Sequence, residues 1–210
     1  NKHYASALLS EAGLPTPATV VAERREDAME AFREFGDVVL KPLFGSNGRG
    51  MVRICEEEVA HRVFGALERE RAVYYVQRTV PHDGRDVRAF VVDGRVVAAG
   101  ERRAQGWRTN VARGGSMHAT DLPREWEELA LRAADAVGVD YGGVDLLPAR
   151  SGEVFVTEVN GIPGWKGLQG ATGVDVAGEV ARWLVGAGEA PAGAGAPDRR
   201  VGHPPTGGPA

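Results

Sequence analysis

An α+β fold of two lobes is predicted by the order of the strand-like and helix-like segments. In the first third of the chain, short apolar runs that read as strands alternate with segments of helical periodicity. Further along, strand-like runs follow one another with turn signals between them, which is typical of an antiparallel sheet. We therefore expect an N-terminal lobe up to about Val76 and a C-terminal lobe built on a largely antiparallel sheet.

The N-terminal lobe takes its predicted elements in sequence order. Residues 2–12 form a short amphipathic helix, which ends at Gly13 because glycine stops helices and the prolines that follow cannot continue one. Residues 26–35 and 56–69 carry apolar side chains at helical spacing and are predicted to be helices. The predicted strands are the apolar runs at residues 19–21, 37–42, 51–55 and 73–77.

The C-terminal lobe begins with a predicted hairpin. Strands at residues 86–92 and 95–100 are joined by Asp93-Gly94, the strongest short-range hairpin signal. A helix closed by Gly138, two strands and a last helix are then predicted at residues 123–137, 142–147, 154–160 and 174–185. The expected organisation is a leading helix (1–13), an N-terminal small lobe (14–78), a C-terminal lobe (79–187) and a disordered Gly/Ala/Pro tail (188–210).

Composition excludes several classes of protein. Hydrophobic residues make up 43% and charged residues 26% of the sequence, as in ordinary globular proteins. The net charge of −4 gives no electrostatic reason to expect a nucleic-acid partner. No apolar run approaches the roughly 20 residues of a spanning helix, so we expect no membrane partner. Cys55 is the only cysteine, which fits a reducing cytoplasm and leaves no internal disulfide.

Oxygen-bearing side chains end two neighbouring strand-like runs near the carboxyl end. Glu158 and Asn160 are two residues apart and so project from the same face of a strand, while Asp145 lies inside the preceding run. If the two runs pair, these side chains converge, and Mg²⁺ is usually held by one or two carboxylates together with substrate phosphates. The alternative is that they are solvated residues at strand ends.

A glycine-rich loop follows an unusual lysine. Gly45, Gly48 and Gly50 lie between two predicted strands, where several backbone N–H groups can be brought against an anion. The segment is neither a Walker A loop nor a Rossmann fingerprint, because a strand and not a helix follows it. An ordinary hairpin loop is the alternative, but Lys41, inside an apolar strand directly before the loop, favours a phosphate site.

Arginines are concentrated between residues 101 and 115. Arg102, Arg103, Arg108 and Arg113 share this segment with glycines, a tryptophan and an asparagine. A solvated loop and RNA binding through the single Arg-Gly-Gly triplet are alternatives. We favour guanidinium groups directed at phosphate and carboxylate, which arginine binds in a bidentate manner.

Taken in order, these motifs resemble the ATP-grasp superfamily, and within it the RimK-like α-L-glutamate ligases. The resemblance runs from Asn1 to about Ala187. It is carried by Val39-Leu-Lys41 with its glycine loop, Asp86-Val-Arg88, Glu101-Arg-Arg103, Arg108-Thr-Asn110, Gly143-Val-Asp145 and Glu158-Val-Asn160. The expected fold is therefore an ATP-grasp fold, two α+β lobes with nucleotide between them.

The resemblance implies a role for each matching residue. ATP would be bound by Lys2, Lys41, the glycine loop (Gly45, Ser46, Gly48, Gly50), the hinge (Gln77, Arg78, Thr79, Val80), Asp86, Arg108, Thr109 and Asn110. Two Mg²⁺ or Mn²⁺ ions would be held by Asp145, Glu158 and Asn160. The transferred phosphoryl group and the acceptor carboxylate would be positioned by Arg88, Arg102, Arg103 and Arg108.

The implied reaction is ATP-dependent formation of an amide through an acyl phosphate. Its substrates would be a small-molecule or protein carboxylate acceptor and an amino acid, which we expect to be L-glutamate. The alternatives are an amino-group-protecting ligase of the same fold, or a truncated module that binds nucleotide without turnover. A homo-oligomer is compatible with the sequence.

Two departures from the family pattern affect these expectations. Arg78-Thr79 stands where the hinge commonly carries an acidic residue. The family also has an N-terminal domain before the ATP-grasp core, which this chain lacks, so we expect a piece of a longer protein. The segment Gly161–Gln169 resembles the branches that add glutamate to small pterin or deazaflavin cofactors more than those that modify ribosomal proteins.

Overall fold

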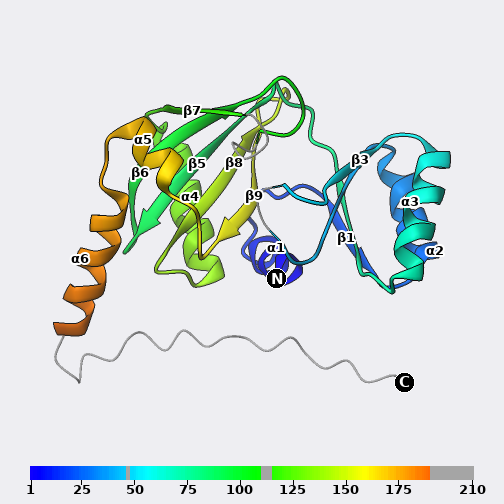
Figure 1. Ribbon diagram of the computed structural model, residues 1–210, viewed down its shortest axis with the longest axis horizontal. Coiled ribbons are helices and arrows are strands. Elements are labelled where there is room, and N and C mark those ends of the chain that lie inside the picture. The colour runs from blue at the N-terminus through cyan, green and yellow to red at the C-terminus, as the bar shows by residue number, and fades with distance from the viewer. Residues whose placement is uncertain (46–47, 110–114, 190–210) are drawn as a thin grey trace.

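Two antiparallel sheets form the two lobes of the molecule (Figure 1). This computed structural model describes residues 1–45, 48–109 and 115–189. The smaller sheet has the strand order β1-β4-β2-β3 and the larger has the order β7-β6-β5-β8-β9. The α+β fold of two lobes predicted from the sequence is confirmed, including the antiparallel sheet of the C-terminal lobe.

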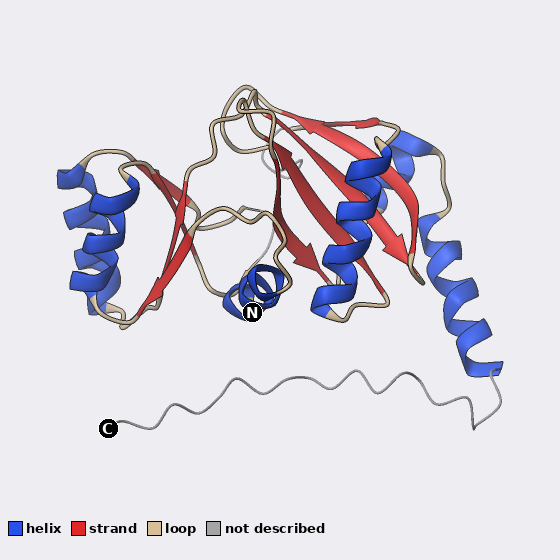
Figure 2. Ribbon diagram, turned by 180° about the vertical axis from the view of Figure 1, so that it is seen from behind, coloured by secondary structure: helices blue, strands red, loops and turns tan. Residues whose placement is uncertain are grey.

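The small lobe is a four-stranded sheet with two helices on its outer face (Figures 1 and 2). Its core brings apolar side chains of both helices against the sheet, among them Phe32, Phe64 and Tyr74, which are nearly fully buried. Its elements are β1 (Thr19–Ala22), α2 (Arg25–Phe35), β2 (Val38–Lys41), β3 (Val52–Ile54), α3 (Glu57–Arg69) and β4 (Tyr74–Arg78).

The leading helix α1 (Lys2–Glu11) joins the two lobes. Leu9 and Leu14 are buried in the core of the large lobe, and the Val156 N–H donates to the Pro15 carbonyl at 2.8 Å. On its other side, the Ser6 hydroxyl lies 2.5 Å from the hydroxyl of Tyr75 in the small lobe. The helix thus brings Lys2, its first residue, to the junction between the sheets.

The large lobe packs helices on both faces of a five-stranded sheet. Its elements are β5 (Arg85–Val92), β6 (Arg95–Arg103), β7 (Ser116–Ala119), α4 (Arg124–Val137), β8 (Tyr141–Pro148), β9 (Val154–Asn160), α5 (Lys166–Thr172) and α6 (Val176–Glu189). Helix α4 buries its alanines against one face. The predicted hairpin is confirmed, since Asp93 and Gly94 connect β5 to β6 with φ angles of 50° and 67°.

The second face of this sheet is divided into an apolar and a charged half. At one end Phe90 and Val92 are covered by α5 and α6 through Leu168 and Val176. Toward the small lobe the same face carries charged side chains, because register sets one charged residue beside another on successive strands. The cross-strand pairs are Asp86 with Arg102, Arg88 with Asp145, and Asp145 with Glu158.

Several boundaries differ from those expected. Strand β7 and helix α5 have no clear sequence signal, because the strand is a short, largely exposed edge and the helix contains two glycines. The last helix begins at Val176 rather than 174 and runs to Glu189. Residues 190–210 of the predicted disordered tail lie outside the described part of the chain. No helix within the described ranges is long and apolar enough to cross a membrane.

Substitution of Gly84 by alanine should destabilise the large lobe. Gly84 has a φ of +69°, and a Cβ there would lie 2.5 Å from the Ala104 carbonyl oxygen. Gly94 has a matching φ of +67° but open space around it. We expect Gly94→Ala to cost about 1–2 kcal/mol of unfolding free energy from backbone strain. Gly84→Ala should cost about 1–3 kcal/mol more, because it adds a steric clash. Urea unfolding of both variants tests this, and equal losses would contradict it.

Candidate functional site

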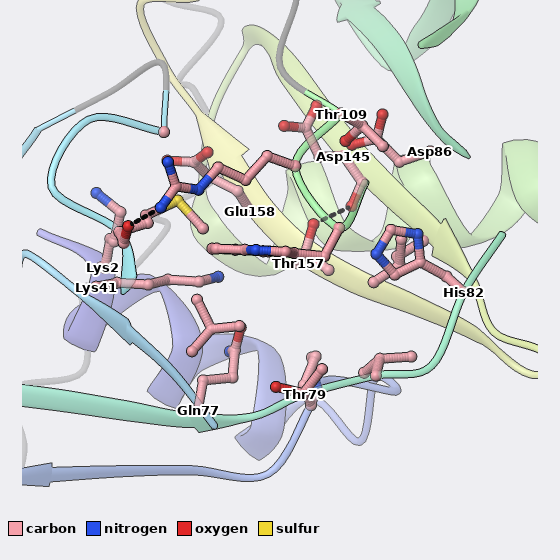
Figure 3. Close-up of a pocket in the computed structure, with 18 of the residues that line it drawn as sticks. Lys2, Lys41, Gln77, Thr79, His82, Asp86, Thr109, Asp145, Thr157 and Glu158 are labelled. Carbon is pink, nitrogen blue, oxygen red and sulfur yellow. Dashed lines mark hydrogen bonds between the residues drawn. The ribbon is translucent and has the colours of Figure 1, made fainter. Parts of the chain in front are cut away.

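An open cavity lies between the two lobes, and α1 contributes to its wall (Figure 3). The chain as a whole carries a net charge of −4. The described side chains that line the cavity have the opposite balance, with the anionic residues Asp86, Asp145 and Glu158 outnumbered by the cationic residues Lys2, Lys41, Arg49, Arg78, Arg102 and Arg108. A cavity of this kind attracts an anionic ligand.

Lysines from two different elements face this cavity. The sequence contains three lysines in all, Lys2, Lys41 and Lys166, and the first two line the wall. Burial lowers the pKa of Lys41 to about 8, partly opposed by the carboxylate of Glu158. The Lys2 ammonium donates to the Gly45 carbonyl at 2.6 Å, which ties α1 to the glycine loop. Because Lys2 and Lys41 line the same cavity, both can contact one ligand.

The glycine loop and the connection after β4 form two further parts of the wall. Gly45 and Gly48 line the cavity, whereas Gly50 packs against Pro42. Ser46 lies outside the described residues. The cavity wall also includes all four predicted hinge residues, Gln77, Arg78, Thr79 and Val80.

The predicted hinge is anchored to the small lobe by hydrogen bonds. The Thr79 hydroxyl and N–H donate to Asp37, at 2.7 Å to the carboxylate and 2.8 Å to the carbonyl. Gln77 donates its amide to the Thr19 hydroxyl at 2.9 Å. The Arg78 guanidinium lies over the ring of Phe35, 4.8 Å from its centroid. The side chain of Arg78 is therefore engaged by the small lobe at the position where the family pattern commonly has an acid.

Two arginines and two aspartates form a buried network in the wall formed by the large lobe. Arg102 pairs with both Asp86 and Asp145, the latter at 2.9 Å. Arg88 donates to both oxygens of Asp145 at 2.7 and 2.8 Å. Burial alone would raise the pKa of Asp145, but Arg102 and Arg88 lower it to about 2. Burial raises the pKa of Asp86. Paired in this way, the four charges compensate one another.

Glu158 faces the same cavity next to this network. It is the cross-strand neighbour of Asp145, and no side chain in the described part of the chain forms a hydrogen bond or ion pair with it. Burial and the nearby Asp145 raise its pKa. Glu158 is therefore the carboxylate in this wall whose oxygens are available to a ligand.

The three predicted metal ligands are only partly assembled. Asp145 and Glu158 line the main cavity, while Asn160 lines an adjoining one and accepts a hydrogen bond from the Ile162 N–H at 3.1 Å. The described residues contain no group of three or more His, Cys, Asp or Glu able to hold a metal ion. Two facing carboxylates nevertheless fit an Mg²⁺ ion that arrives with phosphate oxygens, provided that Asp145 exchanges part of its arginine pairing.

The side chains of the arginine-rich segment do not all face the cavity. Arg108 and Thr109 line the cavity, and Arg108 donates to the Met51 carbonyl of the small lobe. Its Nε atom is buried and has no hydrogen-bond partner among the residues that the structure describes. Arg103 is 66% exposed, pairs with Glu101 and does not line the cavity. Asn110 lies outside the described residues.

Some lining residues were not predicted from the sequence. His82 was not predicted at all, and Trp107 lies in the predicted arginine-rich segment but was given no role there. The Thr157 hydroxyl donates to the Asp145 carbonyl at 3.2 Å (Figure 3). Val39 and Leu147 provide apolar lining from the two lobes. Their strand positions could have suggested apolar walls, but neither histidine nor tryptophan spacing carries a signal here.

Two α+β lobes that share a cationic cavity, with lysines on one side and carboxylates on the other, define a nucleotide-binding class of fold. Residues 1–184 match the RimK-like ATP-grasp domain family, and the chain belongs to that family. The predicted ATP-grasp fold is confirmed by solved structures. The ATP-grasp ligase PsnB, in complex with a precursor variant, Mg and ADP, aligns with a TM-score of 0.70 and 26% identity over 88% of this chain and 58% of that one.

Sequence relatives include several glutamate ligases. Tetrahydromethanopterin:α-L-glutamate ligase of Methanosarcina acetivorans is 34% identical, covering 88% of this chain and 66% of the relative. The ribosomal protein bS6–L-glutamate ligase of Escherichia fergusonii is 36% identical, covering 84% and 60%. The chain thus spans slightly less than two thirds of the length of these curated relatives.

Removal of Arg102 should destabilise the protein far more than removal of Arg103. The Arg102 side chain is 4% exposed and that of Arg103 is 66% exposed. At pH 7, Arg102→Met leaves the buried Asp86 without its cationic partner, while Asp145 keeps Arg88, and we expect a loss of about 3–5 kcal/mol in unfolding free energy. Arg103→Met should lose less than about 1 kcal/mol.

The difference should shrink in acid. Because its folded pKa is lowered to about 2, Asp145 stabilises the parent above about pH 4, and this contribution is lost as the pH falls toward 2. In Arg102→Met the unpaired carboxylate of Asp86 instead takes up a proton on folding, which favours the folded state at lower pH. Denaturant unfolding at pH 7 and pH 4 measures both effects. A loss that is equal for the two variants, or that is unchanged by pH, would contradict this account of the network.

Proposed function

We propose that the chain is the ATP-binding core of a ligase that forms an amide from a carboxylate and an amine through an acyl phosphate. One observation carries the proposal. Lys41 from the small lobe and the carboxylates Asp145 and Glu158 from the large lobe face a single cavity. Membership of the RimK-like ATP-grasp family and the similarity to glutamate ligases support it.

The nucleotide is proposed to lie along the cavity with its base at the hinge. Thr79 and Val80 line the hinge end, and Val39 and Leu147 offer apolar surfaces from the two lobes. Lys2, Lys41 and Arg108 would face the phosphates. We propose domain limits to match, with the small lobe at 14–78 and the large lobe at 79–187 on either side of the nucleotide.

Asp145 and Glu158 are the residues proposed to hold Mg²⁺ or Mn²⁺ together with phosphate oxygens. The ion would neutralise phosphate charge and polarise the transferred group. Asn160 requires a change in its hydrogen bond to Ile162 before it can contribute a ligand to the same cavity. We propose two ions on the strength of the family resemblance.

The chemistry requires positioning and charge neutralisation more than covalent help from side chains. A carboxylate oxygen of the acceptor attacks the γ-phosphorus and ADP leaves, giving an acyl phosphate. The amine then attacks the carbonyl carbon, phosphate leaves and the amine loses a proton. Arg88 and Arg102, already beside Asp145, are proposed to face the transferred phosphoryl group and the acceptor carboxylate. The exposed position of Arg103 offers no comparable support for a role there.

L-Glutamate is the proposed amine, because the sequence relatives are named glutamate ligases. The acceptor class is proposed to be a small cofactor-like carboxylate or a protein carboxylate. The tetrahydromethanopterin ligase similarity fits the first of these, in line with the segment Gly161–Gln169. A cytoplasmic location is also proposed, because the single cysteine, Cys55, and the use of ATP both fit that compartment.

Replacement of Lys41 or Glu158 should abolish metal-dependent turnover. Lys41→Met removes a cation from the phosphate side of the cavity, and Glu158→Gln removes the available carboxylate. Arg69→Met is the control, because Arg69 is an exposed residue of α3 that does not line the cavity. Release of ADP and phosphate is measured with Mg²⁺, L-glutamate and a panel of carboxylate acceptors. We expect losses of at least about 100-fold for the two cavity variants and parent-like rates for the control.

Each alternative has its own outcome in this assay. Turnover with another amino compound in place of glutamate would point to an amino-group-protecting ligase. Magnesium-dependent ADP binding without any product, measured by calorimetry, would favour a nucleotide-binding module. Parent-like turnover by Glu158→Gln or Lys41→Met would contradict the assigned roles.

A further inference from the structure

The segment that carries Arg108 and Thr109 into the cavity has no regular secondary structure of its own. It follows the end of β6, and its described residues reach from Ala104 to Thr109. Arg108 stacks on the ring of Trp107, with 4.6 Å between the guanidinium carbon and the ring centroid. Arg108 also donates to the Met51 carbonyl across the cavity. Contacts with a neighbouring segment are therefore needed to hold the side chains of Trp107 and Arg108 in place.

That neighbouring segment is the connection between β4 and β5, which contains His82. The Ala104 N–H donates to the Gly84 carbonyl at 2.9 Å, and a Cβ on Gly84 would lie 2.5 Å from the Ala104 carbonyl oxygen. The two backbones are thus in direct contact at this point. Residues 79–84 and 104–107 together line a further cavity at this junction.

His82 is linked to the second loop through Gly84. Its Nδ1 accepts a hydrogen bond from the Gly84 N–H at 3.2 Å, and the Gly84 carbonyl in turn accepts from the Ala104 N–H of the other loop. The backbone carbonyl of Trp107, also in the other loop, raises the pKa of the ring. Acceptance at Nδ1 requires the neutral ring with its proton on Nε2. The ring is partly buried and lines the main cavity (Figure 3).

We propose that His82 is a positioning residue for the nucleotide. It holds the Trp107–Arg108 segment against the hinge, so that the hinge can contact the base while Arg108 contacts the phosphates. The inference rests on the proposed nucleotide binding. His82 lies three residues after the hinge residue Thr79, and the segment it holds supplies Arg108 at the phosphate side. His82 thus acts through other residues and takes no part in the chemical step.

The charge state of the ring agrees with this role. Burial lowers the pKa of His82, while Asp86, Asp83 and the carbonyl of Trp107 oppose that effect and Arg150 adds to it. At neutral pH the ring is therefore uncharged and can accept at Nδ1. In acid the protonated ring becomes a donor at both nitrogens and loses the hydrogen bond from the Gly84 N–H.

Two variants of His82 and one control separate positioning from a general loss of structure. His82→Leu removes the hydrogen bond with the Gly84 N–H, whereas His82→Gln retains an amide that can donate and accept without being titrated. His61→Gln changes an exposed histidine on α3, whose ring contacts Arg25 and does not line the cavity. The probe is MgADP, and its dissociation constant is measured by calorimetry with the whole chain.

We expect His82→Leu to weaken MgADP binding about tenfold, which is the effect of losing about one net hydrogen bond's worth of positioning. His82→Gln should stay within about threefold of the parent. Between pH 7.5 and pH 5.5 the affinity of the parent should fall more than that of His82→Gln. Because both bind the same nucleotide, the ratio of the two affinities cancels protonation of the phosphates. His61→Gln should follow the parent at every pH.

Parent-like affinity for His82→Leu, or identical pH profiles for the parent and His82→Gln, would overturn the inference and leave nucleotide binding intact. If His82→Leu does not fold, the comparison of the parent with His82→Gln still decides the matter through its pH profile. No binding of MgADP by the parent would instead remove the proposed function, and the positioning role with it.

Discussion

Charge compensation inside the large sheet is the constraint on which the site depends. Arg88 and Arg102 neutralise Asp86 and Asp145 within the wall, at distances of 2.7 to 2.9 Å where Arg88 and Arg102 meet Asp145. The buried aspartates therefore do not repel an incoming polyanion. What remains facing the cavity is a cationic surface of lysines and arginines with one available carboxylate, Glu158. An acidic chain thereby presents a cationic cavity, suited to phosphate groups that bring a divalent ion with them.

The fold creates this arrangement through strand register and through α1. Antiparallel pairing sets Asp86 beside Arg102, Arg88 beside Asp145, and Asp145 beside Glu158, so that a shift of one residue would send these side chains to the opposite, apolar face. The helix α1 packs on the large lobe through Leu9 and touches the small lobe at Tyr75. The cations of the small lobe and α1 are thereby held opposite the carboxylates.

The sequence predicted what depends on local pattern and missed what depends on contacts between distant segments. Strand and helix order, the Asp93-Gly94 hairpin and the approach of Asp145 to Glu158 were all foreseeable from periodicity and turn chemistry. The pairing of Asp145 with two arginines was not, because it depends on a register across three strands. Nor was the place of Asn160 in an adjoining cavity, or the role of His82 between two loops. The alternation of apolar and polar residues along a strand cannot show which carboxylate oxygens are already paired with an arginine.

A crystal structure of the chain grown with Mn²⁺ and ADP tests the central claim most directly, because manganese is located by its anomalous scattering. The account predicts a manganese peak bounded by the carboxylates of Asp145 and Glu158, with the diphosphate between that peak and the ammonium groups of Lys2 and Lys41. It also predicts that at least one oxygen of Asp145 has left its arginine partner. A nucleotide bound outside the cavity between the lobes, or manganese bound away from both carboxylates, would contradict the account.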